Sequence, residues 1–287
     1  MLSLPCFGTV FFRRLAALAS LPLLALAASP AAAEDARPVE DASLVPTEHV
    51  RDPRLPTLFL VGDSTVKVGT AGQKGWGEEI GPFFDFSKIN VVNRAIGGRS
   101  SRTFQSEGRW VKVLADLKPG DFVLIQFGHN DGGPVNDTHR ARGTLRGTGE
   151  ETEQIDNLIT GRREVVHTYG WYLRKYVSDT RARGATPLLC SPVPRRIWEG
   201  DRIARTPDSY PAWAAAVAAV AAETQTAFLD LHETIALRYE AEGAAAVDAY
   251  FADERTHTTA RGAQVSAGVV AELLRALPGK PFADYLR

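Results

Sequence analysis

The chain has 287 residues, 23% of them charged, and a formal net charge of −1 at pH 7. This near-neutral balance argues against a polyanion partner, so we expect no binding of nucleic acid. A hydrophobic content of 44% argues against an intrinsically disordered chain and is enough for one sizeable core.

The N-terminal segment has the pattern of a secretory signal. Arg13-Arg14 supplies positive charge, residues 15–28 are apolar, and Ala31-Ala32-Ala33 offers small residues for cleavage. The alternative is an uncleaved anchor helix, but the apolar run is short for a bilayer. We therefore predict a signal peptide at 1–33 and a secreted or periplasmic protein without stable membrane insertion after cleavage.

Residues 34–56 are rich in Pro, Asp and Glu without periodicity, which predicts a flexible lead-in before a domain at 57–287. Cys6 lies in the signal, so Cys190 is the only cysteine of the mature chain and no intramolecular disulfide can form. The apolar residues around Cys190 indicate that its side chain is buried as a small hydrophobe. No clustered Cys/His pattern indicates a metal site, and we expect no metal.

Short apolar runs alternate with helical patterns along the rest of the chain. Buried strands are expected at 57–61, 90–93, 121–127, 186–190 and 227–229. Helices are expected at 162–183, 210–224 and 260–277. This alternation predicts a parallel sheet covered by helices on both faces, in a single domain.

The segment 132–161 has little periodicity and follows the third strand. A long irregular loop at that place should overhang the carboxyl edge of the sheet, where ligands bind in such folds.

Ser64 follows the first strand, within Gly62-Asp63-Ser64. A serine at the end of a strand is exposed enough to act as a nucleophile if a general base removes its proton. The alternative is ordinary turn or N-cap chemistry.

Two further strand ends carry groups that stabilise an oxyanion. Gly97-Gly98 lets the backbone approach a ligand and present an N–H group, and the Asn130 side chain can donate from its amide. The alternatives are a turn that needs positive φ and an Asx turn. For His129, beside the third strand, we expect a packing or substrate-facing role and not that of the catalytic base.

His257 precedes the last helix and is the candidate base. Glu254 lies three residues before it and Asp253 four, and either carboxylate can orient the imidazole. The alternative is that these acids cap the helix and that His257 is a solvated polar residue.

These blocks resemble the four-block pattern of the SGNH (GDSL-type) hydrolases. The surrounding sequence, over residues 58–274, is similar to the rhamnogalacturonan acetylesterases of that superfamily. The matching segments are Gly75-Trp76-Gly77, Gly97 to Phe104, Pro192-Val193-Pro194-Arg195 and Thr256-His257-Thr258.

The resemblance implies a three-layer α/β/α fold with a flavodoxin-like, five-stranded parallel sheet. It makes Ser64 the nucleophile and His257 the base. The oxyanion hole then consists of the N–H groups of Ser64 and Gly98 and the Asn130 side chain. The acid of the family usually stands three residues before the histidine, which favours Glu254 over the alternative Asp253.

We therefore expect a monomeric carbohydrate O-acetylesterase without cofactors, which acts on an acetylated polysaccharide or oligosaccharide, with pectic rhamnogalacturonan as the first expectation. The alternatives are an acetylxylan esterase, a lipase- or thioesterase-like enzyme of the same superfamily, and a non-catalytic carbohydrate-binding protein. The candidates for substrate binding are Trp76, Arg99, Arg195 and Trp198.

Overall fold

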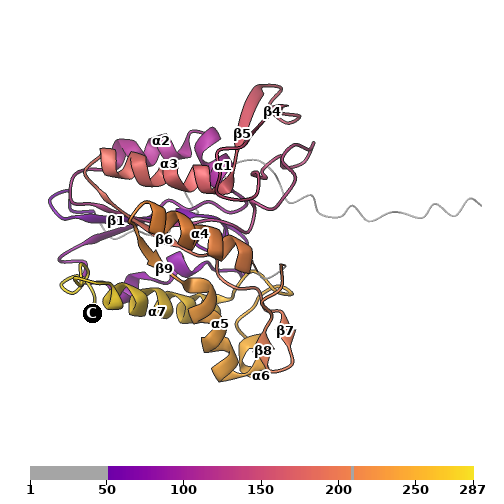
Figure 1. Ribbon diagram of the computed structural model, residues 1–287. Coiled ribbons are helices and arrows are strands. Elements are labelled where there is room, and N and C mark those ends of the chain that lie inside the picture. The colour runs from indigo at the N-terminus through magenta and orange to yellow at the C-terminus, as the bar shows by residue number, and fades with distance from the viewer. Residues whose placement is uncertain (1–50, 208–209) are drawn as a thin grey trace, which may run out of the picture. The chain divides into compact units, whose positions relative to one another are not determined.

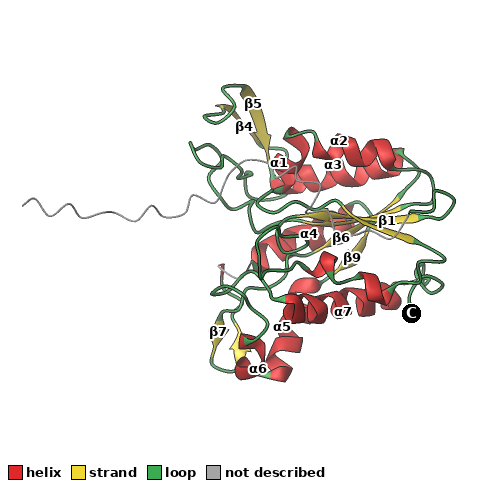
Figure 2. Ribbon diagram, turned by 180° about the vertical axis from the view of Figure 1, so that it is seen from behind, coloured by secondary structure: helices red, strands yellow, loops and turns green. Residues whose placement is uncertain are grey.

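The computed structural model describes residues 51–207 and 210–287, so the predicted signal peptide lies outside the described residues. Helices cover both faces of a central sheet in the described domain (Figures 1 and 2). This arrangement confirms the predicted three-layer α/β/α class.

The sheet has five parallel strands in the order β2-β1-β3-β6-β9. This is the flavodoxin-like order, which the resemblance implied. The strands are nearly continuous in apolar residues and lie within one residue of the expected bounds. They are β1 (Thr57–Gly62), β2 (Asn90–Asn93), β3 (Phe122–Gln126), β6 (Thr186–Cys190) and β9 (Ala227–Leu229).

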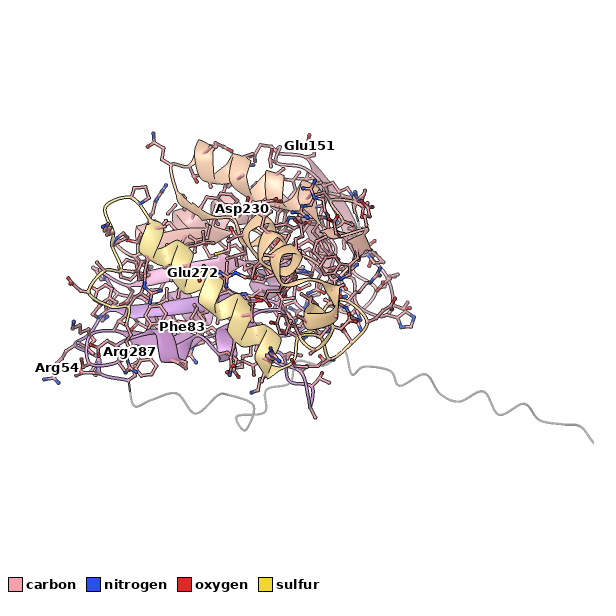
Figure 3. All side chains as sticks on the ribbon, turned by 90° about the horizontal axis from the view of Figure 1, so that it is seen from below. Arg54, Phe83, Glu151, Asp230, Glu272 and Arg287 are labelled. Carbon is pink, nitrogen blue, oxygen red and sulfur yellow. The ribbon has the colours of Figure 1, made fainter. Side chains whose placement is uncertain are left out.

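Side chains alternate between two hydrophobic cores, one on each face of the sheet. In β1, Phe59 and Val61 pack with one core, while Leu58 and Leu60 pack with the other. The first core is covered by α2 (Arg109–Asp116), α3 (Tyr169–Ala182) and α4 (Pro211–Glu223). The second is covered by α5 (Leu231–Glu242) and α7 (Ala260–Ala276), and α7 lies across the strands in Figure 3.

The smaller elements lie between these layers and in the loops. They are η2 (Trp76–Glu78), η3 (Gly81–Phe83), α1 (Ser101–Ser106), α6 (Ala244–Asp248), β7 (Trp198–Glu199) and β8 (Arg202–Ile203). No helix in the described part of the chain has the length and apolarity needed to cross a bilayer.

The start of the helix predicted at 162–183 is a strand instead. β5 (Arg163–His167) pairs antiparallel with β4 (Thr152–Asp156), and the hairpin projects from the domain (Figure 1). The hydroxyl oxygen of Thr168 then caps α3 by accepting from the N–H of Trp171. β-Branched Val165 and Val166 fit an extended strand, and the Thr168 cap sets the helix start at Tyr169.

The packed domain also begins before Thr57, the boundary expected from the sequence. The N–H of Asp52 donates to Asn90 Oδ1 at 2.9 Å, and Asn90 Nδ2 donates to the carbonyl oxygen of Asp52 at 2.8 Å. Residues just ahead of β1 are thus tied to the start of β2.

The strand order determines where a ligand-binding site can form. β1 pairs with β2 on one side and β3 on the other, so the direction of chain winding reverses here. Ligands of such sheets bind outside the carboxyl ends of the strands at this reversal. The ends of β1 and β3 also approach closely, because a Cβ on Gly62 would lie 2.5 Å from the carbonyl oxygen of Gln126.

Candidate active site

A tight turn after β1 presents Ser64 at the carboxyl edge. The buried Asp63 carboxylate accepts from the N–H of Thr65 at 2.9 Å and from its hydroxyl at 2.8 Å. The carbonyl oxygen of Asp63 accepts from the N–H of Val66 at 3.1 Å. Asp63 therefore holds the turn from inside, while Ser64 is only half-buried.

Ser64 is joined to His257 and Asp253 by two short contacts. His257 Nε2 lies 2.9 Å from Ser64 Oγ, and His257 Nδ1 lies 2.5 Å from Asp253 Oδ2. The side chains of His257 and Asp253 are 23% and 33% exposed, so the pair is accessible from solvent. A hydroxyl, an imidazole and a carboxylate in this order have the geometry of an activated serine nucleophile.

The expectation for Glu254 needs correction, because its neighbour Asp253 contacts the imidazole. Glu254 is exposed and offers only its backbone carbonyl oxygen, which accepts from Arg196. The three-residue spacing suits a helix, but α7 begins at Ala260, after this segment. In the loop, Asp253 Oδ1 instead accepts from the N–H groups of the residues that follow it, at 3.0 Å (Arg255), 2.7 Å (Thr256) and 2.9 Å (His257).

Those contacts also set the charge of the Asp253 carboxyl. Burial raises its pKa, but the backbone N–H groups of Thr256 and His257 and the His257 ring together lower it below the ordinary value. Asp253 is thus held as a carboxylate facing the imidazole.

The Gly97-Gly98 backbone passes Ser64 at Gly97, and Asn130 is tied to Arg99, the residue that follows Gly98. A Cβ on Gly97 would lie 3.6 Å from Ser64 Cβ, so this backbone runs along the serine. Within residues 51–207 and 210–287, no acceptor pairs with the N–H of Ser64 or of Gly98. Asn130 Nδ2 donates to the carbonyl oxygen of Arg99 at 2.9 Å, which orients the amide and leaves one of its two N–H bonds for another acceptor.

His129 is buried against Asp63, the residue that holds the Ser64 turn. Its side chain is 4% exposed, and Nε2 lies 3.0 Å from the carbonyl oxygen of Val193. Its Nδ1 lies 3.6 Å from Asp63 Oδ2. Burial raises the pKa of Asp63, but the interaction with His129 and the hydrogen bonds from Thr65 lower it overall. This buried position is that of a packing residue.

Two of the four expected substrate-binding residues are buried and paired inside the protein. Trp76 is 1% exposed and donates to Gln126 Oε1 at 2.7 Å. Arg99 is 9% exposed and contacts Glu107 and the carbonyl oxygen of Gly97, both at 3.0 Å. The indole N–H of Trp76 and the Nε and Nη1 groups of Arg99 are thus used within the fold. Arg195 and Trp198 are partly exposed, although Trp198 packs against the core.

Two arginines outside the predicted set of site residues, Arg142 and Arg102, shape this edge. Arg142 Nη1 donates to the carbonyl oxygen of Gly98 at 3.0 Å. Buried Arg102 donates to the carbonyl oxygens of Val135 and Gly143 at 2.7 and 2.8 Å, which anchors the long segment after β3. Their acceptors are backbone carbonyls remote in sequence, which no local motif reveals.

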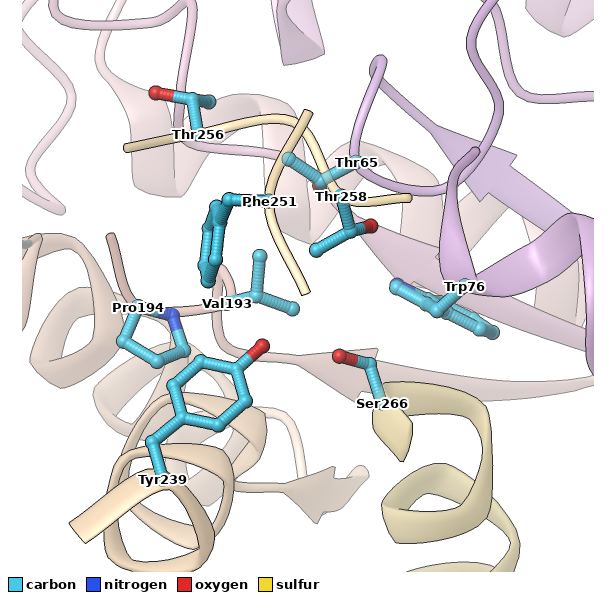
Figure 4. Close-up of a pocket in the computed structure, with 9 residues that line it drawn as sticks. All are labelled: Thr65, Trp76, Val193, Pro194, Tyr239, Phe251, Thr256, Thr258 and Ser266. Carbon is cyan, nitrogen blue, oxygen red and sulfur yellow. The ribbon is translucent and has the colours of Figure 1, made fainter. Parts of the chain in front are cut away.

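A small cavity lies behind the loops that carry Ser64 and His257. Its lining includes Thr65 and Thr256, the neighbours of these residues, and the hydroxyls of Tyr239 and Ser266 point into it (Figure 4). Its volume is about 10 Å³, roughly the room for one water molecule, which is too small for a sugar. Within the described residues, no group of three His, Cys, Asp or Glu side chains could hold a metal ion.

Comparison with known proteins agrees with this geometry. The model of the GDSL-like lipase/acylhydrolase family matches residues 60–265. The rhamnogalacturonan acetylesterase of Emericella nidulans is 34% identical over 211 residues, which cover 74% of this chain and 81% of that protein. The probable rhamnogalacturonan acetylesterase YesY of Bacillus subtilis is 32% identical over 234 residues, covering 79% and 95%. The resemblance found in the sequence is thereby confirmed.

Solved structures share the fold. YxiM of Bacillus subtilis matches with a TM-score of 0.61 at 22% identity, covering 77% of this chain and 56% of that one. A catalytic mutant of Axe2, an acetylxylan esterase from Geobacillus stearothermophilus, matches with a TM-score of 0.50 at 20% identity, covering 77% and 93%. At these identities the likeness concerns the fold alone.

Buried Asp131, next to Asn130, generates a prediction about stability. Its Oδ1 accepts from the N–H and the hydroxyl of Ser101 at 3.1 and 2.5 Å, which ties it to the start of α1. Burial raises its pKa from 3.8 to about 7. Between these values the folded state keeps a proton that the unfolded state has released, so ionisation of Asp131 lowers the free energy of unfolding as pH rises.

We expect Asp131→Asn to remove this pH-dependent fall in the free energy of unfolding. In urea unfolding at pH 5 and pH 8, the wild type should lose more stability on raising the pH than the variant does. Asp156→Asn, at an exposed position on the hairpin, should behave as the wild type. An equal loss of stability in wild type and Asp131→Asn would contradict the assignment.

Proposed function

Because this chain belongs to the GDSL-like lipase/acylhydrolase family and is a carboxylic ester hydrolase, we propose that it removes acetyl groups from a carbohydrate with Ser64 as nucleophile. The observation that carries the proposal is the pair of contacts from Ser64 Oγ to His257 Nε2 and from His257 Nδ1 to Asp253 Oδ2, at 2.9 and 2.5 Å. The relatives named as rhamnogalacturonan acetylesterases support the choice of an acetylated carbohydrate.

In the first step, Ser64 Oγ attacks the acetyl carbonyl carbon while His257 Nε2 takes the hydroxyl proton. The negative charge that develops on the carbonyl oxygen is stabilised by the N–H groups of Ser64 and Gly98 and by the free N–H of Asn130. Each such donor lowers the barrier by about 3 kcal/mol. Asp253 stabilises the imidazolium and keeps Nε2 directed at the serine.

In the second step, His257 gives the proton to the departing sugar oxygen, which leaves an acetyl group on Ser64. A water molecule then attacks this ester while His257 takes its proton, and the collapse of the second tetrahedral intermediate releases acetate and restores the serine. All proton transfers pass through one imidazole.

The substrate we propose is acidic pectic rhamnogalacturonan. Burial raises the pKa of Tyr210, and so does the charge of Asp63, whereas the positive charges of Arg195, Arg255 and Arg142 oppose that rise. The Arg195 guanidinium stacks over the Tyr210 ring at 4.7 Å, and the Tyr210 hydroxyl donates to the carbonyl oxygen of His129 at 3.2 Å. Guanidinium groups suit a polymer whose galacturonate units carry carboxylates. A neutral xylan offers them no such partner.

We propose that the protein acts outside the cytoplasm, in the secreted or periplasmic location predicted from its N-terminal sequence. A polysaccharide substrate fits that location, since polymers of this size are met outside the cell. The proposal includes a monomeric enzyme, because one chain supplies the serine, the imidazole, the carboxylate and the three donors.

Acetate release from matched polymers tests the proposed function. We expect kcat/KM on acetylated rhamnogalacturonan to exceed that on acetylated xylan by about tenfold or more, with the preference shrinking at high salt as charges are screened. Ser64→Ala should stay folded and lose activity by about 10,000-fold.

Each alternative function predicts a different result in this assay. Equal or better activity on xylan would make the protein an acetylxylan esterase, and a preference for long-chain acyl esters would make it lipase-like. Absence of acetate release from every polymer would contradict the proposed acetylesterase activity.

The identity of the acid is tested by two neighbouring substitutions. Asp253→Asn should lower kcat/KM by about 100- to 10,000-fold, because an amide cannot stabilise the imidazolium and favours the wrong tautomer. Its remaining carbonyl oxygen can still accept from the loop N–H groups, so the loop should stay folded. Glu254→Gln is the matched control and should retain wild-type kcat/KM. Loss of activity in Glu254→Gln alone would overturn the role of Asp253.

A further inference from the structure

Arg196 lies outside the triad but contacts the loop that carries two of its members. Its Nη2 donates to the carbonyl oxygens of Glu254 and Asp253 at 2.5 and 3.4 Å, and its Nε donates to that of Glu254 at 3.1 Å. The backbone N–H of Arg196 donates to the carbonyl oxygen of Arg255 at 2.9 Å. Three consecutive carbonyls of the acid–histidine loop are thus held by one residue.

The guanidinium is itself held in place. Nη1 lies 2.9 Å from Asp248 Oδ1, and the guanidinium carbon lies 5.2 Å from the centroid of the Phe251 ring. The side chain is 19% exposed although it lies near the surface. A planar cation with several fixed donors can satisfy the carboxylate, the ring face and the carbonyls together, which a lysine cannot do.

The opposite side of the same loop is organised by Asp253. Its Oδ1 accepts the N–H groups of Arg255, Thr256 and His257, while Arg196 takes the carbonyls of the residues at the start of this turn. The loop ends are closed by the backbone pairing of Phe251 with Thr258. With the amides gathered on the carboxylate and the carbonyls on the guanidinium, little freedom remains for the Asp253 side chain.

We propose that Arg196 is a positioning residue that fixes the loop so that Asp253 Oδ2 meets His257 Nδ1. This inference rests on the proposed function and adds to it a residue that touches neither substrate nor the reacting atoms. A misplacement of about 1 Å at a catalytic group can cost on the order of 100-fold in rate. Loss of Arg196 should therefore act on kcat and not on substrate binding.

Arg196→Ala should lower kcat on p-nitrophenyl acetate by about 10- to 100-fold, with KM changed by less than about twofold. Arg196→Lys should fall between Ala and wild type, and added guanidinium ion should restore part of the kcat of Arg196→Ala. Arg205 offers a matched control, because it contacts Glu233, Glu240 and a carbonyl oxygen away from the triad loop. Arg205→Ala should keep the wild-type kcat and gain nothing from guanidinium.

A proton NMR measurement gives a readout that needs no ester substrate. The downfield Nδ1–H resonance of His257, assigned by its loss in His257→Asn, should shift or broaden in Arg196→Ala and stay unchanged in Arg205→Ala. If Arg196→Ala does not fold, the same measurements on Arg196→Lys decide. A folded Arg196 variant with wild-type kcat and an unchanged resonance would overturn the proposal, whereas a wild type without esterase activity would refute the proposed function instead.

Discussion

The hydrogen bond between His257 Nε2 and Ser64 Oγ joins residues 193 positions apart in the chain, and most of the local structure serves to keep it short. Ser64 is fixed by the turn that Asp63 holds from inside, at the end of a strand buried on both faces. His257 is fixed by Asp253, which is itself held by backbone groups of its own loop. A change at either end that lengthens this contact would leave the fold intact and remove the chemistry.

The parallel sheet makes this meeting possible. β1 and β3 are neighbours at the point where the direction of winding reverses, so the loops after them open outward at one edge. Ser64, Gly98 and Asn130 come from loops after three adjacent strands, and the last loop brings His257 back to the same edge. A small residue is needed where the ends of these strands meet, as at Gly62 of β1, where a Cβ would lie against the carbonyl oxygen of Gln126.

The sheet was readable from sequence because its strands are short apolar runs, whose burial on both faces leaves a strong local signal. The hairpin of β4 and β5 was not predicted, because the apolar residues of Arg163–His167 continue the helical spacing of the helix that follows. The short helix α1 was missed for a different reason. Its six residues are too few to show a helical period, although Ser100 caps them locally and Asp131, 30 residues away, accepts from Ser101.

The site residues likewise divide into those that the local sequence predicts and those whose contacts it does not reveal. Ser64, Gly98, Asn130 and His257 stand at strand ends or before a helix, where position along the chain already suggests a role. The carboxylate depends on how one loop is wound, and a spacing argument that assumes a helix selects Glu254 where the loop brings Asp253 to the imidazole. Trp76 and Arg99 have partners that the sequence does not reveal: Gln126, 50 residues away, and Glu107, eight away.

Covalent labelling shows whether Ser64 is a nucleophile that His257 activates. The wild-type protein is treated with a serine-directed alkyl phosphonate, and the modified peptide is identified by mass spectrometry. We expect a single adduct on Ser64, formed at least about 100-fold more slowly in His257→Ala, because the general base is lost. An adduct on a different serine would exclude Ser64 as the nucleophile, and equally fast labelling of Ser64 without His257 would exclude His257 as its base.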